Sequence, residues 1–230
     1  MSSASAHHRP ALRASRLAVL GVFFANGAVI GTWVVRIPAV QHRLGLGEGL
    51  LGVALLGAAV GALAAMPLVG ALVSRFGSRR IVGATALMLV LSLVLPALAP
   101  NLFLLVASLM LLGAANGGLD VAMNAQAVAV ERGYVRPIMS SFHAAWSFGG
   151  LGGAALGGLL ASRGIGPLPH FSEVAFLAAI VFACAYGALL PSRADASEEG
   201  TPAFARPTLA LLGLGIISFC VLLGEGAMGD

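Results

Sequence analysis

Long apolar stretches dominate this sequence and restrict the folds that it can adopt. Six of them reach about 20 residues, the length that an α-helix needs to cross the hydrocarbon core of a bilayer. They are expected at residues 17–35, 50–73, 81–99, 102–130, 138–161 and 171–190, and a seventh begins near Thr208. Charged residues make up 10% of the chain, whereas soluble domains contain about 25%. The sequence therefore predicts an all-α protein that crosses a membrane several times.

The arginines are distributed unevenly among the connections, and this asymmetry predicts the orientation of the helices. All 13 basic residues are arginine. Ten of them precede the first stretch or follow the second, fourth and sixth, and the other three are Arg36, Arg43 and Arg163. Because cytoplasmic loops carry an excess of positive charge, we expect the N-terminus and these even-numbered connections to lie in the cytoplasm. The expected location is the plasma membrane.

Several classes of function find no support in the sequence. No basic stretch is interleaved with aromatic residues that could stack on bases, so no nucleic-acid partner is expected. The cysteines and histidines lack the spacing of a metal site, and no cofactor is expected. Cys184 and Cys220 lie within apolar stretches and are interpreted as core residues. Because motifs such as G-x-S-x-G and H-E-x-x-H are missing, neither an enzyme nor a catalytic residue is expected.

A polar segment divides the chain and suggests its domain organisation. Residues 191–207 have the composition of a linker, which the arginine distribution puts in the cytoplasm. Residues 1–190 are then a six-helix N-terminal transmembrane bundle, and residues 208–230 are the truncated seventh helix of a C-terminal half. The tripeptide Ala-Asn-Gly at residues 25–27 recurs at residues 115–117, ninety residues later. Its place in the first and fourth stretches favours a 3+3 repeat.

One acidic residue lies deep within the fourth stretch. Asn116, Asp120 and Asn124 follow one another at intervals of four, so a helix places them on one side. A carboxylate near the middle of a membrane helix costs about 3 kcal/mol or more. The stripe is therefore expected to face protein or water and to serve a function. The alternative is a structural carboxyl that is hydrogen-bonded to one of the two asparagines.

Two residues of the fifth stretch reach similar depths. With a rise of 1.5 Å per residue, Asn124 and His143 lie ~10 and ~9 Å from the inner boundary, and Asp120 and Trp146 lie ~16 and ~13 Å from it. If the fourth and fifth helices are neighbours, these four residues share one layer. The alternatives are an interhelical hydrogen bond for His143 and a lipid or core contact for Trp146.

Four further polar residues are interpreted by their position. Asn26 of the first stretch is expected to join this layer from across a cavity, and Glu225 of the seventh is expected to face it from the other half. Arg36 is expected to extend its charge to the outer boundary. Glu131 is expected to lie as an interfacial charge at the inner boundary.

The connection at residues 70–80 resembles the cytoplasmic signature of the major facilitator superfamily. The matching residues are Gly70, Leu72, Arg75, Gly77, Arg79 and Arg80. Gly70 is expected to allow close packing, Gly77 to allow a tight turn, and the arginines to anchor the loop at anionic headgroups. Ser74 stands where the family has an aspartate that helps to lock the cytoplasmic gate. The resemblance implies that this lock is weaker here or is made in another way.

Three further segments are similar to the fucose-permease-like branch of that superfamily. They are residues 33–38, 120–124 and 140–146. The resemblance covers essentially the whole chain and implies a transporter of twelve spans, of which this sequence is the N-terminal half with part of the seventh span. The sequence lacks the arginine that many proton-coupled members have in span four and the Gly-Pro pair that drug antiporters have in span five. Both absences argue against multidrug export.

The polar stripe and the resemblance together predict a secondary active transporter that works by alternating access. Asp120 is expected to bind a proton when its cavity is dry and to release it when the cavity is wet, which couples transport to protons, with symport favoured. The amides and Trp146 would hold a small polar solute, with sugars as a candidate class. The expected partners are this solute, the proton, the bilayer and the missing C-terminal half. The alternatives are an efflux transporter of the same superfamily and a membrane receptor or scaffold without transport.

Overall fold

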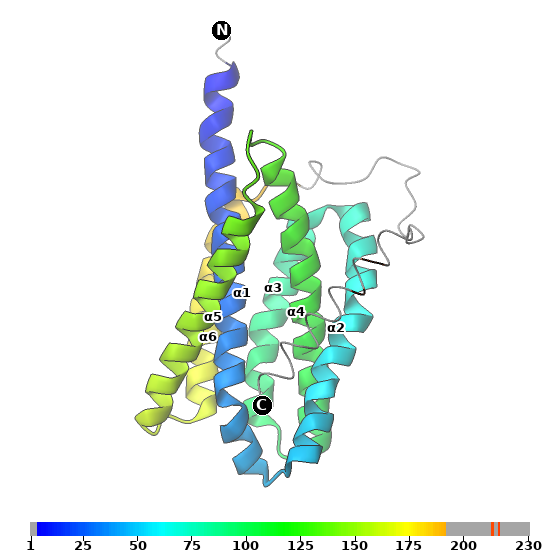
Figure 1. Ribbon diagram of the computed structural model, residues 1–230, viewed down its shortest axis with the longest axis vertical. Helices are drawn as coiled ribbons and strands as arrows, with labels where there is room; N and C mark the ends of the chain where they lie inside the picture. The colour runs from blue at the N-terminus through cyan, green and yellow to red at the C-terminus, as the bar shows by residue number, and fades with distance from the viewer. Residues whose placement is uncertain (1–3, 192–212, 214–215, 217–230) are drawn as a thin grey trace. The chain divides into compact units, whose positions relative to one another are not determined.

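The computed structural model describes residues 4–191 together with residues 213 and 216. Residues 4–191 form an all-helical bundle of six helices without strands (Figure 1). The helices are α1 (Ala4–Leu44), α2 (Glu48–Phe76), α3 (Ser78–Leu98), α4 (Leu102–Glu131), α5 (Met139–Ser162) and α6 (Pro167–Ala188). Each of the six is long and apolar enough to cross a membrane, which confirms the predicted fold class and the number of spans in this range. Most of the predicted linker, nearly all of the expected seventh helix and Glu225 lie outside the described residues.

Helix α1 is much longer than the predicted span of residues 17–35. It continues through Pro38 to Leu44 and ends where Gly45 takes a positive φ of 61°. The amide of Gly45 donates to the carbonyl of His42, and the amide of Leu46 donates to that of Gln41, which is how a glycine ends a helix. Hydropathy marks where lipid contact ends, but a helix can continue in polar surroundings until such a stop signal. Arg36 consequently lies within the helix.

The connections between helices are short. Gly77 alone joins α2 to α3, and its φ of 79° is the left-handed conformation that favours glycine. The tight turn predicted at Gly77 is therefore confirmed. At the start of α4, the side chain of Asn101 accepts a hydrogen bond from the amide of Leu104 at 3.0 Å.

The packing of the helices follows the predicted 3+3 repeat. Helix α1 packs most extensively on α5, and α4 does so on α2; α1 also contacts α6, and α4 also contacts α3. If α1 corresponds to α4, α2 to α5 and α3 to α6, then the α1–α5 pair corresponds to the α4–α2 pair, and the α1–α6 pair to the α4–α3 pair. The chain therefore builds the bundle from two three-helix units of the same internal order.

Small residues allow the two most extensive helix pairs to approach closely. A Cβ at Gly27 of α1 would overlap the carbonyl oxygen of Trp146 in α5, and a Cβ at Gly113 of α4 would overlap that of Ala58 in α2. Glycines at such positions let helix backbones touch, which is a main source of association within lipid. The first of these contacts holds the polar residues of α1 and α5 near one another.

Candidate functional site

The polar stripe of α4 is partly buried. Asn116, Asp120 and Asn124 are each partly exposed, whereas Leu119 and Met123, on another side of the same helix, are buried. A helical period of 3.6 residues separates the two sides in this way. The core thus takes the apolar side of α4, and the carboxylate and amides lie at the margin of the packed interior.

Asn26 joins three helices through its amide. The indole Nε1 of Trp146 donates to Asn26 Oδ1 at 2.7 Å, and Asn26 Nδ2 donates to Asn116 Oδ1 at 2.9 Å. Asn26 itself is only 1% exposed, so both of its polar atoms are satisfied where water has little access. Asn26 and Asn116 are the two asparagines of the repeated tripeptide, and their direct contact places both at the meeting point of the two three-helix units.

Asp120 lies one helical turn from Asn116 and is held by Asn124. The side chain of Asn124 donates to Asp120 Oδ1 at 3.1 Å and to the main-chain oxygen of Asp120 at 2.9 Å. His143 of α5 is exposed and packs edge-to-face with Phe23 of α1, with 5.4 Å between ring centres. Asp120 and Asn124 therefore form one polar group beside the Asn26 network.

The two helices that carry this site are not packed neighbours. Helices α4 and α5 touch only slightly, because α5 packs on α1 and α4 packs on α2. Trp146 therefore reaches the α4 stripe through Asn26, where the sequence suggested a direct α4–α5 layer. The interhelical hydrogen bonds run from α5 to α1 and then from α1 to α4.

The connection between α2 and α3 differs in part from its predicted form. A Cβ at Gly70 would meet no atom within 4 Å, so the expected close packing there does not occur among the described residues. Ser74 donates to the carbonyl of Ala71 in its own helix at 2.8 Å. The Arg75 guanidinium lies 5.2 Å from the Phe76 ring centre, and that of Arg79 lies 4.9 Å from the Tyr186 ring centre. Arg80 follows in the first turn of α3 and is exposed.

Arg36 is a buried residue, contrary to the expectation that it extends to the outer boundary. It is 3% exposed, and its Nε donates to Nδ1 of His170 at 3.1 Å. His170, in the first turn of α6, is fully buried, and its Nε2 and one terminal nitrogen of Arg36 have no hydrogen-bond partner among the described residues. Because the His170 ring lies beside Gly157 of α5, the pair is enclosed by three helices. Sequence reasoning missed His170, although the segment at residues 33–38 was already conspicuous.

Two other polar residues of α4 have structural roles. Glu131 Oε2 accepts hydrogen bonds at 2.6 Å from the amides of Ile138 and Met139, so it caps the start of α5 and is not a simple interfacial charge. Gln126 is fully buried and exchanges two hydrogen bonds with the main chain of Leu190, at 3.0 and 3.1 Å. Neither role has a local sequence signal, since each partner lies in another element.

The described residues hold no cluster that would bind a metal ion. No group of three or more histidines, cysteines and acids lies together among them. Cys184 is exposed on α6, contrary to its interpretation as a core residue, and Cys220 lies outside the described residues. The chemistry available at the site is therefore hydrogen bonding by amides and an indole, together with a carboxyl and an imidazole that can exchange protons.

Comparisons with known proteins place this arrangement in a family context. The sequence profile of the Major Facilitator Superfamily matches residues 17–226. An uncharacterized transporter of Sinorhizobium fredii, y4wD, is 35% identical over 216 residues, which are 90% of this chain and 55% of that protein. An uncharacterized MFS-type transporter of Yersinia pestis is 34% identical over 208 residues, which are 90% of this chain and 54% of that protein.

A third relative extends the match to nearly the whole chain. Membrane protein MosC of Rhizobium meliloti is 35% identical over 229 residues, which are 97% of this chain and 54% of that protein. The chain thus spans about half the length of the curated relatives that it matches.

Proposed function

The chain belongs to the Major Facilitator Superfamily, and from this membership we propose that it supplies the N-terminal half of a secondary active transporter. Residues 1–190 act as the first bundle, residues 191–207 as the linker and residues 208–230 as the start of the second bundle. The transported species is a small polar solute, with sugars as a candidate class, as in the fucose-permease-like branch. Rocking of the two halves about the solute gives alternating access.

The observation that carries this proposal is the hydrogen-bonded group along the polar stripe of α4. Trp146, Asn26 and Asn116 are connected by hydrogen bonds at 2.7 and 2.9 Å, and Asp120 follows one turn along the same side of α4. Asn116, Asn124 and Trp146 are partly exposed and suit a solute rich in hydroxyl groups, because amides offer donors and acceptors and the indole offers an aromatic face. The solute binds against this surface, and Glu225 of the seventh helix approaches it from the second half.

Asp120 couples the transport of solute to protons. A carboxyl in a closed, dry cavity favours its neutral form, and the same carboxyl in a wet cavity favours its charged form. Asn124 donates a hydrogen bond to this carboxyl and can hold its charged form when water enters. A proton that binds on one side of the membrane is thus released on the other, together with the solute.

The arginine distribution supports an orientation for the chain in the plasma membrane. The N-terminus and the α2–α3 and α4–α5 connections lie in the cytoplasm, where anionic lipids attract Arg75, Arg79 and Arg80. Gly77 makes the α2–α3 turn and Gly70 lies near the end of α2, and this end of the helix pair acts at the cytoplasmic gate. Because residue 74 is serine, the contacts that lock this gate do not include a carboxylate at that position.

The test is solute accumulation by the full-length transporter in liposomes with an imposed pH gradient. A panel of radiolabelled monosaccharides and polyols identifies a solute, and an enclosed pH dye reports proton entry with it. Asp120→Asn should abolish accumulation against a gradient while solute exchange continues. Glu131→Gln is the matched control, because it neutralises the other acid of α4 and keeps a side-chain oxygen that can cap α5. Full accumulation by Asp120→Asn would refute the coupling role.

The same assay separates the alternatives. A protein that binds a solute of the panel but gives no flux in either direction is a receptor or scaffold. A protein that moves the solute out of the liposomes while protons enter them is an efflux transporter. Either result would refute symport and leave the family membership intact.

A further inference from the structure

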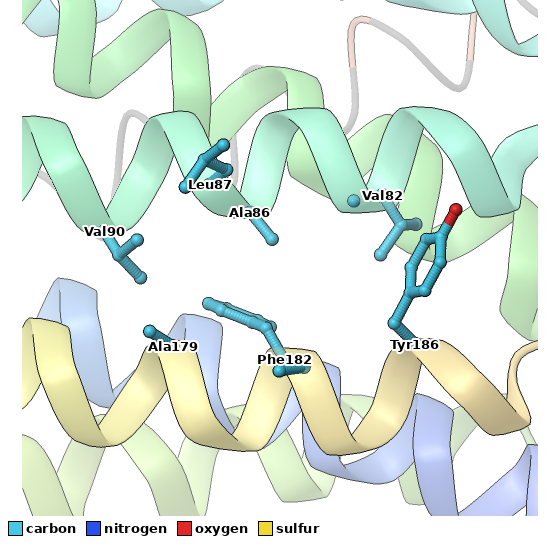
Figure 2. Close-up of a pocket in the computed structure, with 9 residues that line it drawn as sticks. Val82, Ala86, Leu87, Val90, Ala179, Phe182 and Tyr186 are labelled. Carbon is cyan, nitrogen blue, oxygen red and sulfur yellow. The ribbon is translucent and has the colours of Figure 1, made fainter.

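A cavity of about 320 Å³ lies between α3 and α6 (Figure 2). Val82, Ala86 and Val90 line it from α3, and Ala179, Phe182 and Tyr186 line it from α6. Figure 2 shows the rings of Phe182 and Tyr186 rising from α6 into the space below α3. Apart from the Tyr186 hydroxyl, the side chains drawn there are hydrocarbon, so the cavity is a slot for an apolar chain.

The slot ends at a cation. Tyr186 lies at the end of the slot where α3 begins and α6 ends, and the Arg79 guanidinium lies 4.9 Å from the centre of its ring. The Nε of Arg79 is buried and has no hydrogen-bond partner among the described residues. Arg80 adds a second, exposed positive charge in the same turn of α3. An apolar slot with arginines at one end is complementary to an amphiphile with an acidic head.

The position of Tyr186 is set by a glycine of α3. A Cβ at Gly83 would lie 2.8 Å from Cε2 of Tyr186, so only glycine lets the ring rest directly on the helix. The ring in turn supports the Arg79 guanidinium through a cation–π contact. The cation is therefore held at the mouth of the slot and does not simply extend into bulk water.

The slot belongs to the outer side of the bundle. Leu87 of α3 lines it and is 59% exposed. The lining residues all come from α3 and α6, whereas the polar stripe lies on α4. The slot is thus separate from the proposed solute site and is open to lipids of the bilayer.

We propose that this slot is a binding site for an anionic phospholipid. One acyl chain occupies the space between α3 and α6, and the phosphate of the headgroup pairs with Arg79, with Arg80 as a second contact. Basic pockets between helices at the end of a membrane bundle recognise anionic headgroups in this way. The lipid would connect the third helix of one three-helix unit to the third helix of the other.

The test is native mass spectrometry of the full-length protein, equilibrated with equal amounts of phosphatidylglycerol and phosphatidylethanolamine. The wild type should retain phosphatidylglycerol selectively. Arg79→Gln should reduce that retention about five-fold, the effect of one basic residue on the attraction to an anionic surface. Arg75→Gln is the matched control, because Arg75 contacts Phe76 in α2 and is not part of the slot. Equal losses in the two variants would overturn the proposal, since they indicate general surface charge.

The apolar part of the site needs its own pair of variants. Ala183→Phe puts a ring into the slot and should displace the lipid, whereas Cys184→Phe puts a ring on the exposed neighbour outside the slot and should not. Glycerol 3-phosphate, a headgroup without chains, should fail to compete; effective competition would identify a phosphate site that needs no lipid. Retention of phosphatidylglycerol by Ala183→Phe would exclude an acyl chain from the slot.

A measurement on the wild type tests the proposal without relying on the correct folding of any variant. Phosphatidylglycerol with a photoreactive diazirine in its acyl chain should label peptides that contain residues 82–90 and 179–186. A phosphatidylethanolamine analogue with the same chain should label them several-fold less. Equal labelling by both analogues, or labelling spread evenly over all six helices, would refute a specific site. A failed solute assay would leave these results unaffected.

Discussion

Counting ninety residues onward from α1 gives its counterpart in α4, and the two helices differ most in their polar residues. Asn26 corresponds to Asn116, and these two residues bind one another. One turn further, Ile30 stands where α4 has Asp120. The two three-helix units therefore share a framework of small residues and one asparagine, whereas only the second carries the carboxylate. A repeat can keep its packing while one copy acquires the chemistry.

The comparison also explains how α6 is held. Arg36 of α1 corresponds to Gln126 of α4, and both are buried residues that reach α6. Arg36 binds His170 in the first turn of α6, and Gln126 binds the main chain of Leu190, just beyond its end. Equivalent positions in oppositely directed helices thus secure the two ends of the same helix. Each position serves packing through a different side chain.

The largest predicted effect concerns Gly27 and Gly117, the glycines of the repeated tripeptide, which should respond differently to substitution. In Gly27→Ala the new methyl overlaps the backbone of Trp146, whereas in Gly117→Ala it meets Ala62 at 3.0 Å, where a small shift suffices. Overpacking costs about 1–3 kcal/mol, and alanine returns about 1 kcal/mol of helix propensity. We expect Gly27→Ala to lower the free energy of unfolding by about 2 kcal/mol and Gly117→Ala to leave it nearly unchanged. Unfolding in mixed detergent micelles measures both, and equal losses would contradict a closer helix approach at Gly27 than at Gly117.

A second prediction separates the two residues that hold α6. Gln126→Leu leaves the amide and carbonyl of Leu190 unpaired in a partly buried place, which should cost about 1–3 kcal/mol. Arg36→Met removes a donor to His170 but also removes a buried charge, so its net cost should be below about 1 kcal/mol. Hydrogen exchange should rise near Leu190 in the first variant and near His170 in the second. A larger loss for Arg36→Met would reveal a partner of Arg36 beyond the described residues.

The smallest predicted effect compares the two asparagines that meet. Asn26→Ala breaks two interhelical hydrogen bonds, and Asn116→Ala breaks one. Trp146 and Asn116 are partly exposed, so water can replace Asn26 as their partner, whereas Asn116→Ala leaves the buried Nδ2 of Asn26 without an acceptor. We expect Asn116→Ala to be less stable than Asn26→Ala by about 1 kcal/mol. Tryptophan fluorescence should shift in Asn26→Ala and stay constant in Asn116→Ala; the reverse pattern would place Trp146 on another partner.

Local patterns in the sequence predicted the elements well, and the exceptions have physical reasons. The spacing of Asn116, Asp120 and Asn124 predicted one polar side of α4, because helical period is a property of a single segment. Hydropathy failed at the end of α1, because it reports lipid contact while Gly45 ends the helix. The position of Arg36 was also mispredicted. An arginine near the end of a span can extend to the membrane boundary or be buried against a partner, and here the buried His170 is that partner.

The amino-acid sequence was enough to predict the six membrane-crossing helices, the turn at Gly77, the polar side of α4 and the membership of a transporter superfamily. These are properties of one segment or of composition, and they need no knowledge of neighbouring helices. The packing of the helices was needed to show that α1 lies between α5 and α4, that Asn26 joins Trp146 to Asn116, and that Arg36 meets His170. Such pairs lie 90 to 134 residues apart in the chain. They form only where small residues let particular helices pack closely enough for side chains to meet.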